Sequence, residues 1–176
     1  IRPPGHHALP DKSMGFCLFS NLALGAVYAL NKYKLDRILI LDWDAHHGNG
    51  TEQIFYKSNK VFTVSWHQYP HWPFTGKYDE IGEGEGLGYN MNIPIPEGFT
   101  DEIFFETYEN LVVPLAKKYK PQLILLAAGY DAHWKDHLAK LNVTTNAYAH
   151  LSKKVMDLAE ELCQGRVVAT LEGGYN

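Results

Sequence analysis

Short apolar runs alternate along this chain with segments whose apolar residues recur at helical spacing. Runs rich in β-branched and apolar residues predict strands at 37–42, 61–66, 88–95, 123–128 and 166–171. Helical periodicity predicts helices at 19–32, 101–120 and 146–163. Continuously apolar strands separated by helices indicate an α/β fold, a three-layer parallel sheet with helices on both faces and right-handed crossovers.

Residues that start or stop helices agree with this assignment. Thr100 is placed to cap the helix at 101–120, and Pro121 to end it, while Gly165 follows the helix at 146–163. Residues 68–87 carry prolines and glycines without apolar periodicity and predict a long surface loop. No linker or internal repeat divides the chain, so we expect a single domain over 1–176.

Composition narrows the possible partners. With 45% hydrophobic residues in 176 and no apolar run long enough for a bilayer, the chain predicts one globular domain and no membrane partner. A net charge of −4 with scattered Lys and Arg argues against a nucleic-acid partner. The first residues lack the pattern of a signal peptide, and Cys17 and Cys163 lie far apart in apolar surroundings. Buried thiols in the reducing cytoplasm are therefore expected.

Polar side chains follow several predicted strands. Asp42, Asp44 and His46 come after the run at 37–42, and alternate positions allow the latter two to reach one ion. A helix-capping Asp beside surface histidines is the alternative. Asp131 and Tyr175 follow two other runs, and ligands of open α/β sheets bind beyond the carboxyl ends of strands. Asp44, His46 and Asp131 would leave a coordination position open, as catalytic zinc requires, although Fe(II) or Mn(II) also suit these donors.

A second group of candidates lies at the amino end. Pro3, Pro4 and Gly5 stiffen and then turn the backbone before the pair His6 and His7. A tandem pair of this kind is either an accident of a surface loop or a part of the same site.

Five segments together resemble successive motifs of the zinc-dependent histone deacetylase family, in its class II-like branch. They are Arg2-Pro3-Pro4-Gly5-His6-His7-Ala8, Gly15-Phe16-Cys17, Asp42-Trp43-Asp44-Ala45-His46-His47-Gly48-Asn49-Gly50-Thr51, Ala128-Gly129-Tyr130-Asp131-Ala132 and Leu171-Glu172-Gly173-Gly174-Tyr175-Asn176. The match runs in order from end to end. It implies the arginase/deacetylase fold and hydrolysis of the acetyl-lysine amide, with an acetyl-lysine peptide or a small acetylated amine as substrate.

The resemblance also implies a role for each matching residue. The Zn²⁺ ligands would be Asp44, His46 and Asp131. His7, oriented by Asn49, would be the general base, and His6, oriented by Asp42, would supply positive charge near the leaving group. Tyr175 would donate a hydrogen bond to the carbonyl oxygen as it becomes anionic. Phe16, Trp72 and Leu138 would line the substrate tunnel.

Two further cations are implied by the same resemblance. A structural K⁺ would use Asp42, Asp44, His46, Ser65 and Trp66. A more distant cation would use main-chain oxygens near Phe55, Ser58, Val61 and Tyr89.

Alternatives to a lysine deacetylase stay open. They are an acetylpolyamine amidohydrolase, disfavoured by the apolar Leu138 where some such relatives place an acidic gatekeeper, and a catalytically silent acyl-lysine binding module. A manganese ureohydrolase shares the fold, but Asp131 lacks the second Asp-x-Asp of a binuclear site. Acidic residues of the loop at 68–87, namely Asp79, Glu80, Glu83 and Glu85, are interpreted as a rim that attracts basic segments.

Length adds one more expectation. Complete domains of this family are about twice as long, so we expect a central to C-terminal excerpt truncated at both ends. Exposed sheet edges would then favour self-association and could leave the isolated chain inactive.

Overall fold

A single parallel sheet forms the centre of the molecule. The computed structural model describes residues 2–176. Its strands are β1 (Ile38–Asp42), β2 (Val61–Gln68), β3 (Asn90–Ile95), β4 (Leu123–Ala128) and β5 (Val167–Leu171). They are all parallel, in the order β3-β2-β1-β4-β5. The predicted α/β fold with a parallel sheet is confirmed.

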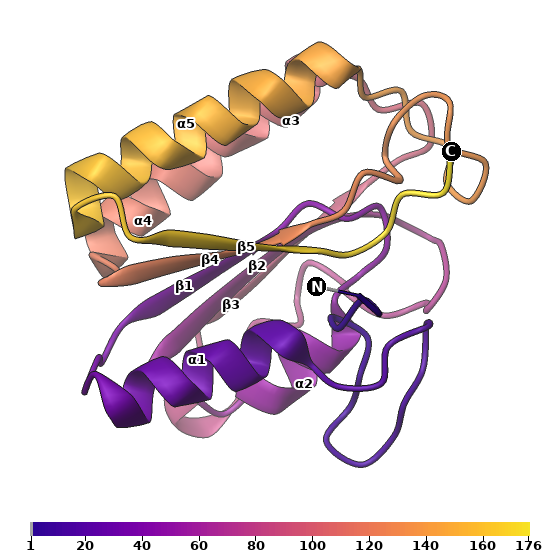
Figure 1. The fold of residues 1–176 in the computed structure, drawn as a ribbon. Helices are drawn as coiled ribbons and strands as arrows, with labels where there is room; N and C mark the ends of the chain where they lie inside the picture. The colour runs from indigo at the N-terminus through magenta and orange to yellow at the C-terminus, as the bar shows by residue number, and fades with distance from the viewer. Residues whose placement is uncertain (1) are drawn as a thin grey trace.

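Helices cover both faces of this sheet. They are α1 (Asn21–Lys32), α2 (Asn49–Phe55), α3 (Asp101–Thr107), α4 (Val113–Tyr119) and α5 (Thr145–Cys163). Helices α1 and α2 lie on one face, and α3, α4 and α5 lie on the other (Figure 1). Both chain ends lie toward the same end of the sheet (Figure 1).

The pairing of strand β1 shows why its sequence is apolar from Ile38 to Leu41. It pairs with β2 on one side and β4 on the other, so it is buried along its whole length. Ile38 and Ile40 pack in the cluster on the α1 side, while Leu39 and Leu41 pack in the cluster on the α5 side. Each such side chain stabilises the fold by about 1.5–3 kcal/mol, and together they fix where β1 ends.

The helix predicted at 101–120 is interrupted. Between α3 and α4 lies a π-helical turn, Tyr108–Val112, in which the N–H of Val113 reaches the carbonyl of Tyr108. Pro114 explains it, because proline has no N–H to donate and its ring clashes with the carbonyl one α-helical turn earlier. The expected Thr100 cap is wrong in its chemistry, since the Thr100 side chain makes no capping bond.

Two short elements differ from the sequence-based expectation, and the edge strand β5 is exposed, as expected of a truncated sheet. Helix α2, only 7 residues long, was not predicted, because so short a segment shows no clear period. The loop after β2 contains a short 3₁₀ turn, Gly84–Gly86. Strand β5 is covered incompletely: Val168 is 53% and Leu171 46% exposed.

Cys17 and Cys163 are buried free thiols, as expected. None of the helices within residues 2–176 combines the length and the apolar character that a bilayer crossing demands.

Candidate metal centre

Three side chains able to bind a metal meet at the carboxyl ends of two neighbouring strands. Asp44 and His46 follow β1, and Asp131 follows β4. Because these strands are parallel neighbours, with Asp42 opposite Ala127, the segments after them emerge side by side. One potential ligand atom from each of the three residues lies within 4.8 Å of the others, and all three residues are buried.

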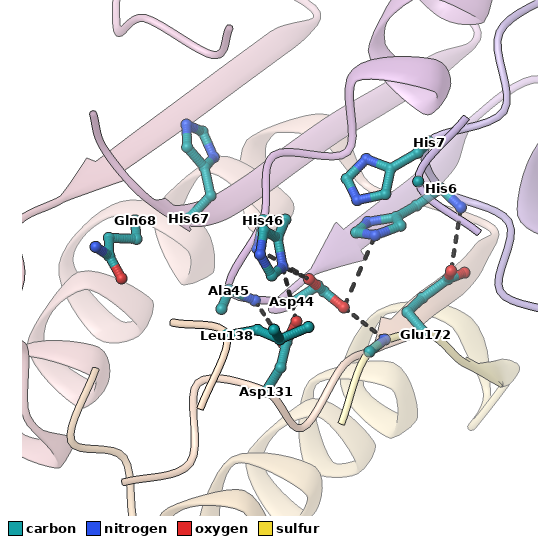
Figure 2. Close-up of polar contacts among 12 residues, drawn as sticks. His6, His7, Asp44, Ala45, His46, His67, Gln68, Asp131, Leu138 and Glu172 are labelled. Atoms are coloured by element: carbon teal, nitrogen blue, oxygen red, sulfur yellow. Dashed lines mark hydrogen bonds and ion pairs between the residues drawn. The ribbon is translucent and has the colours of Figure 1, made fainter. Parts of the chain in front are cut away.

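The distances within this trio suit one small cation. His46 Nδ1 lies 2.8 Å from Asp131 Oδ2 and 3.2 Å from Asp44 Oδ1, and Figure 2 shows His46 facing both carboxylates. Donors around a tetrahedral zinc ion stand about 3.3–3.5 Å apart, so a slight separation of these atoms would admit one. Two carboxylates and an imidazole are ligands that zinc accepts. The residues present therefore fit a zinc ion.

Backbone N–H groups hold the two carboxylates in place. Ala45 N–H donates to Asp131 Oδ1 at 2.8 Å, and Gly173 N–H donates to Asp44 Oδ2 at 2.7 Å. A Cβ at Gly173 would lie 2.3 Å from Asp131 Oδ2, and one at Gly129 would lie 2.2 Å from Asp44 Oδ2. Glycine is therefore required at both positions by the close approach of the backbone to the ligands.

The electrostatics of the trio also favour a cation. Burial opposes a charge on His46, but its hydrogen bonds to Asp131 and Asp44 raise its pKa to about 10. Burial and the charge of Asp44 raise the pKa of Asp131 to about 7. Burial would raise the pKa of Asp44, but His6 and His46 lower it well below its ordinary value. Buried carboxylates are costly unless paired, and a divalent ion would pair both.

The tandem histidines stand beside the trio in two different protonation states. His6 Nδ1 donates to Asp42 Oδ2 at 2.8 Å, and its Nε2 lies 3.8 Å from Asp44. Burial opposes the charge of His6, but Asp42 and Asp44 raise its pKa well above the ordinary value. The His7 and His6 ring centroids lie 3.9 Å apart with the rings tilted by 42°, and burial together with the charge of His6 lowers the pKa of His7 to about 2.

Asn49 determines which nitrogen of His7 carries the hydrogen. The side-chain oxygen of Asn49 lies 2.8 Å from His7 Nδ1, while its nitrogen points to the sulfur of Met14. An amide oxygen only accepts, so Nδ1 is the protonated atom and Nε2 keeps its lone pair. The His7 ring lies 6.1 Å from that of His46, so a neutral base adjoins the trio.

Glu172 is a site residue to which sequence reasoning gave no role. Its side chain is fully buried, and one carboxylate oxygen accepts the N–H groups of Gly5 at 2.6 Å and His6 at 3.1 Å. Figure 2 shows it beneath the His6 backbone. An acidic residue between an apolar strand and two glycines was the available signal, but its partners lie at the far end of the chain.

The predicted tunnel residues surround the approach to the trio. Trp72 packs edge-on against His7, with ring centroids 4.6 Å apart, and lies 6.0 Å from His46. Phe16 packs 6.1 Å from the Tyr175 ring and is 71% exposed. The Leu138 carbonyl accepts from His71, whose ring lies 5.1 Å from that of His46. Burial, then the charges of Asp44 and Asp131, raise the pKa of Tyr175 above its ordinary value, so its hydroxyl stays protonated.

The residues expected to hold K⁺ beyond the trio have other contacts. Ser65 Oγ lies 3.0 Å from His67 Nδ1, and the Trp66 indole donates to Thr107 at 3.0 Å. Trp66 could offer only its main chain to an ion. The assignment of Ser65 and Trp66 to a potassium site therefore stays a prediction.

A second polar cluster surrounds His47, next to the candidate ligand His46. His47 bonds Thr75 at 2.8 Å and Glu52 at 3.2 Å, and the same Glu52 oxygen accepts from Asn90 and Asn92 at 2.6 and 2.7 Å. Burial would raise the pKa of Glu52, but His47 and the two amides lower it below its ordinary value. This cluster supports the backbone next to His46.

The acidic rim expected in the loop after β2 is only partly correct. Glu80 turns inward and accepts the N–H groups of Gly76 and Lys77 at 2.7 and 3.0 Å. Glu83 pairs with Lys57 instead. Glu80 is therefore a structural residue of this loop.

Comparison with known proteins agrees with the motifs. The profile of the histone deacetylase domain matches residues 1–176. The chain is 46% identical to "Histone deacetylase 10, chloroplastic" of Oryza sativa subsp. japonica, covering 100% of this chain and 40% of that protein. It is 45% identical to a "Probable deacetylase" of Archaeoglobus fulgidus, again over 100% of this chain and 49% of the relative.

A solved structure shares the same arrangement of elements. The crystal structure of the HDA15 HD domain superposes with a TM-score of 0.91 at 37% identity, covering 100% of this chain and 51% of that one. The chain thus spans about half, or less, of the length of the proteins to which it is similar.

Proposed function

This chain belongs to the histone deacetylase domain family, and from that premise we propose that it hydrolyses the acetyl amide of N-acetyl-lysine side chains with the help of one zinc ion. The observation that carries the proposal is the convergence of Asp44, His46 and Asp131 beside a neutral, oriented His7. Acetate and a free lysine amine would be the products.

A zinc ion held by Asp44, His46 and Asp131 would act as a Lewis acid that polarises the carbonyl and lowers the pKa of water. The protein supplies the proton transfers. His7 Nε2, left without a hydrogen by the Asn49 contact, accepts the proton of the attacking water and then donates it to the lysine nitrogen as the C–N bond breaks. The low pKa of His7 keeps this nitrogen free at neutral pH.

Charge that develops during the reaction meets two preorganised groups. The Tyr175 hydroxyl, kept protonated by its raised pKa, donates to the carbonyl oxygen as that atom becomes anionic. His6, held by Asp42 and positively charged, lies behind His7 and stabilises negative charge close to the reacting atoms. His6 acts without rearrangement, because Asp42 already holds its ring.

The walls of the approach favour an uncharged substrate. Trp72 and Phe16 present aromatic surface, and Leu138 presents an aliphatic one. An acetylated lysine stem is neutral and suits such walls, whereas a free ammonium loses its hydration there without gaining a partner. Release of the charged product amine is thereby favoured.

The test is turnover of a fluorogenic acetyl-lysine peptide by the zinc-loaded protein, with a chelator control. Activity that a chelator abolishes and zinc restores is the expected result. An acetylated diamine assayed in parallel tests the acetylpolyamine alternative, which requires a higher kcat/KM for the diamine. Tight binding of the peptide without turnover would instead identify a silent acyl-lysine module and refute the proposal.

A further inference from the structure

One carboxylate near the metal centre holds two segments that the proposed reaction needs. Asp136 lies on the loop between Asp131 and Leu138, and its side chain is buried. Its Oδ2 accepts the backbone N–H of Tyr175 at 2.8 Å, and its Oδ1 accepts the N–H of Leu138 at 2.9 Å. The carboxylate therefore links the backbone of the proposed oxyanion donor to the backbone of a tunnel wall.

The Tyr175 segment needs such an attachment. Two glycines precede Tyr175, and Gly174 adopts φ +129°, a conformation open to glycine alone, so the backbone there is intrinsically free. Two other hydrogen bonds join the Tyr175 segment to the loop after β4. The N–H of Tyr130 donates to the Gly173 carbonyl at 2.9 Å, and the side-chain amide of Asn176 donates to the Lys135 carbonyl at 2.9 Å. Of these three bonds, only the one to Asp136 holds Tyr175 itself.

The other end of the link continues across the site entrance. The carbonyl of Leu138 accepts from His71 Nε2 at 3.0 Å. The His71 ring lies 5.1 Å from the ring of His46, in the loop that also carries Trp72. A series of contacts thus runs from Tyr175 through Asp136 and Leu138 to the loop that carries His71.

We propose that Asp136 is a positioning residue, whose carboxylate fixes the Tyr175 backbone so that the phenolic hydroxyl stays aimed at the substrate carbonyl. This inference rests on the proposed deacetylase function. A carboxylate suits the task because each of its oxygens accepts from a different N–H, whereas asparagine offers one acceptor oxygen and a donor in place of the second.

A double-mutant cycle on the zinc-loaded protein tests the link. Asp136→Ala should lower kcat by about tenfold or more, with KM and zinc content changed less than about twofold. In the Tyr175→Phe background the same substitution should have a much smaller effect, because the hydroxyl that it misplaces is already gone. An equal factor in both backgrounds would overturn the proposal.

Hydrogen exchange supplies a readout that does not depend on activity. The Tyr175 and Leu138 amides should exchange faster in Asp136→Ala, and unchanged exchange at Tyr175 would refute the positioning role. If the alanine variant does not fold, Asp136→Asn serves, since it can keep only one of the two bonds and must expose at least one of the two amides. If Tyr175→Phe retains full rate, the proposed oxyanion role fails, while the exchange data still decide whether Asp136 holds the segment.

Asp101 offers a matched control. Its carboxylate also accepts a backbone N–H, that of Thr144 at 2.8 Å, together with the Thr144 hydroxyl at 2.6 Å, but this pair holds the start of α5. Asp101→Ala should lower stability and leave kcat within about twofold of the unsubstituted protein. A loss of kcat equal to that of Asp136→Ala would mean that the effect is general damage to the fold.

Discussion

The carboxylate of Glu172 accepts the backbone N–H of Gly5 at 2.6 Å and so joins residues 167 positions apart in the chain. The same oxygen accepts the N–H of His6, and the Arg2 guanidinium donates to the Glu172 carbonyl. The segment after the last strand therefore holds the tandem histidines against the metal ligands. The position of His7, the proposed base, therefore depends on these contacts with the C-terminal segment as well as on its own loop.

Glu172→Ala should destabilise the protein measurably. It leaves two buried N–H groups without an acceptor, and each such group costs about 1–3 kcal/mol. Glu172→Gln keeps an acceptor oxygen and should lose less. Urea unfolding of the three proteins at neutral pH measures the differences, and equal stability of the alanine variant and the unsubstituted protein would contradict the assignment.

Asp131→Ala should lose the metal. The substitution removes one of three ligands, and the remaining two cannot retain a zinc ion through dialysis. Mass spectrometry of the metal content before and after dialysis provides the measurement. Asp36→Ala, at an exposed ion pair with Lys60, is the control and should keep its zinc. Full zinc occupancy in Asp131→Ala would rule out the proposed centre.

Metal affinity should fall as the pH falls. A proton and a metal ion compete for the same atoms, and the pKa of His46, about 10, and that of Asp131, about 7, place this competition at neutral pH and above. Uptake of zinc at neutral pH should therefore release at least one proton. Calorimetry in two buffers of different ionisation enthalpy counts the protons, and the absence of any release would contradict this competition.

Tyr175→Phe should lower kcat by about 10² or more while metal content is unchanged, because it removes one donor to the developing oxyanion. Tyr130→Phe is a matched control, since Tyr130 lies on the neighbouring segment after β4 and its ring packs against that of Tyr148, with centroids 5.0 Å apart. Steady-state kinetics with the acetyl-lysine peptide measure both. A full rate in Tyr175→Phe would remove this residue from the mechanism.

Glu52 should make stability depend on pH. Its pKa is lowered in the folded protein, so its contribution is fully present above the ordinary carboxyl pKa and is lost as the pH falls through the folded value. Glu52→Gln should therefore cost most at neutral pH, and the difference should shrink in acid. Urea unfolding from about pH 7 to about pH 3 follows the trend, because the loss lies below the ordinary carboxyl pKa, and a difference that grows in acid would contradict it.

The local pattern of residues was sufficient for much of this protein. The apolar runs fixed the parallel strands, because a strand covered on both faces must be apolar at every position. Asp44, His46 and Asp131 could be predicted as candidate metal ligands because they stand directly after such strands, and the structure brings them together. His6 and His7 were found through the resemblance of their motif, and the structure places both beside the trio.

Only the tertiary structure decided how these parts are held. The strand order places β4 beside β1 and β5 beside β4, and this adjacency brings Gly173 onto Asp44 and Glu172 onto His6. A carboxylate in a sequence does not reveal which N–H group it will accept, since that choice depends on contacts between segments far apart in the chain. The sequence thus determined the fold class and the three candidate metal ligands, while contacts between the two ends of the chain determined the partners that orient them.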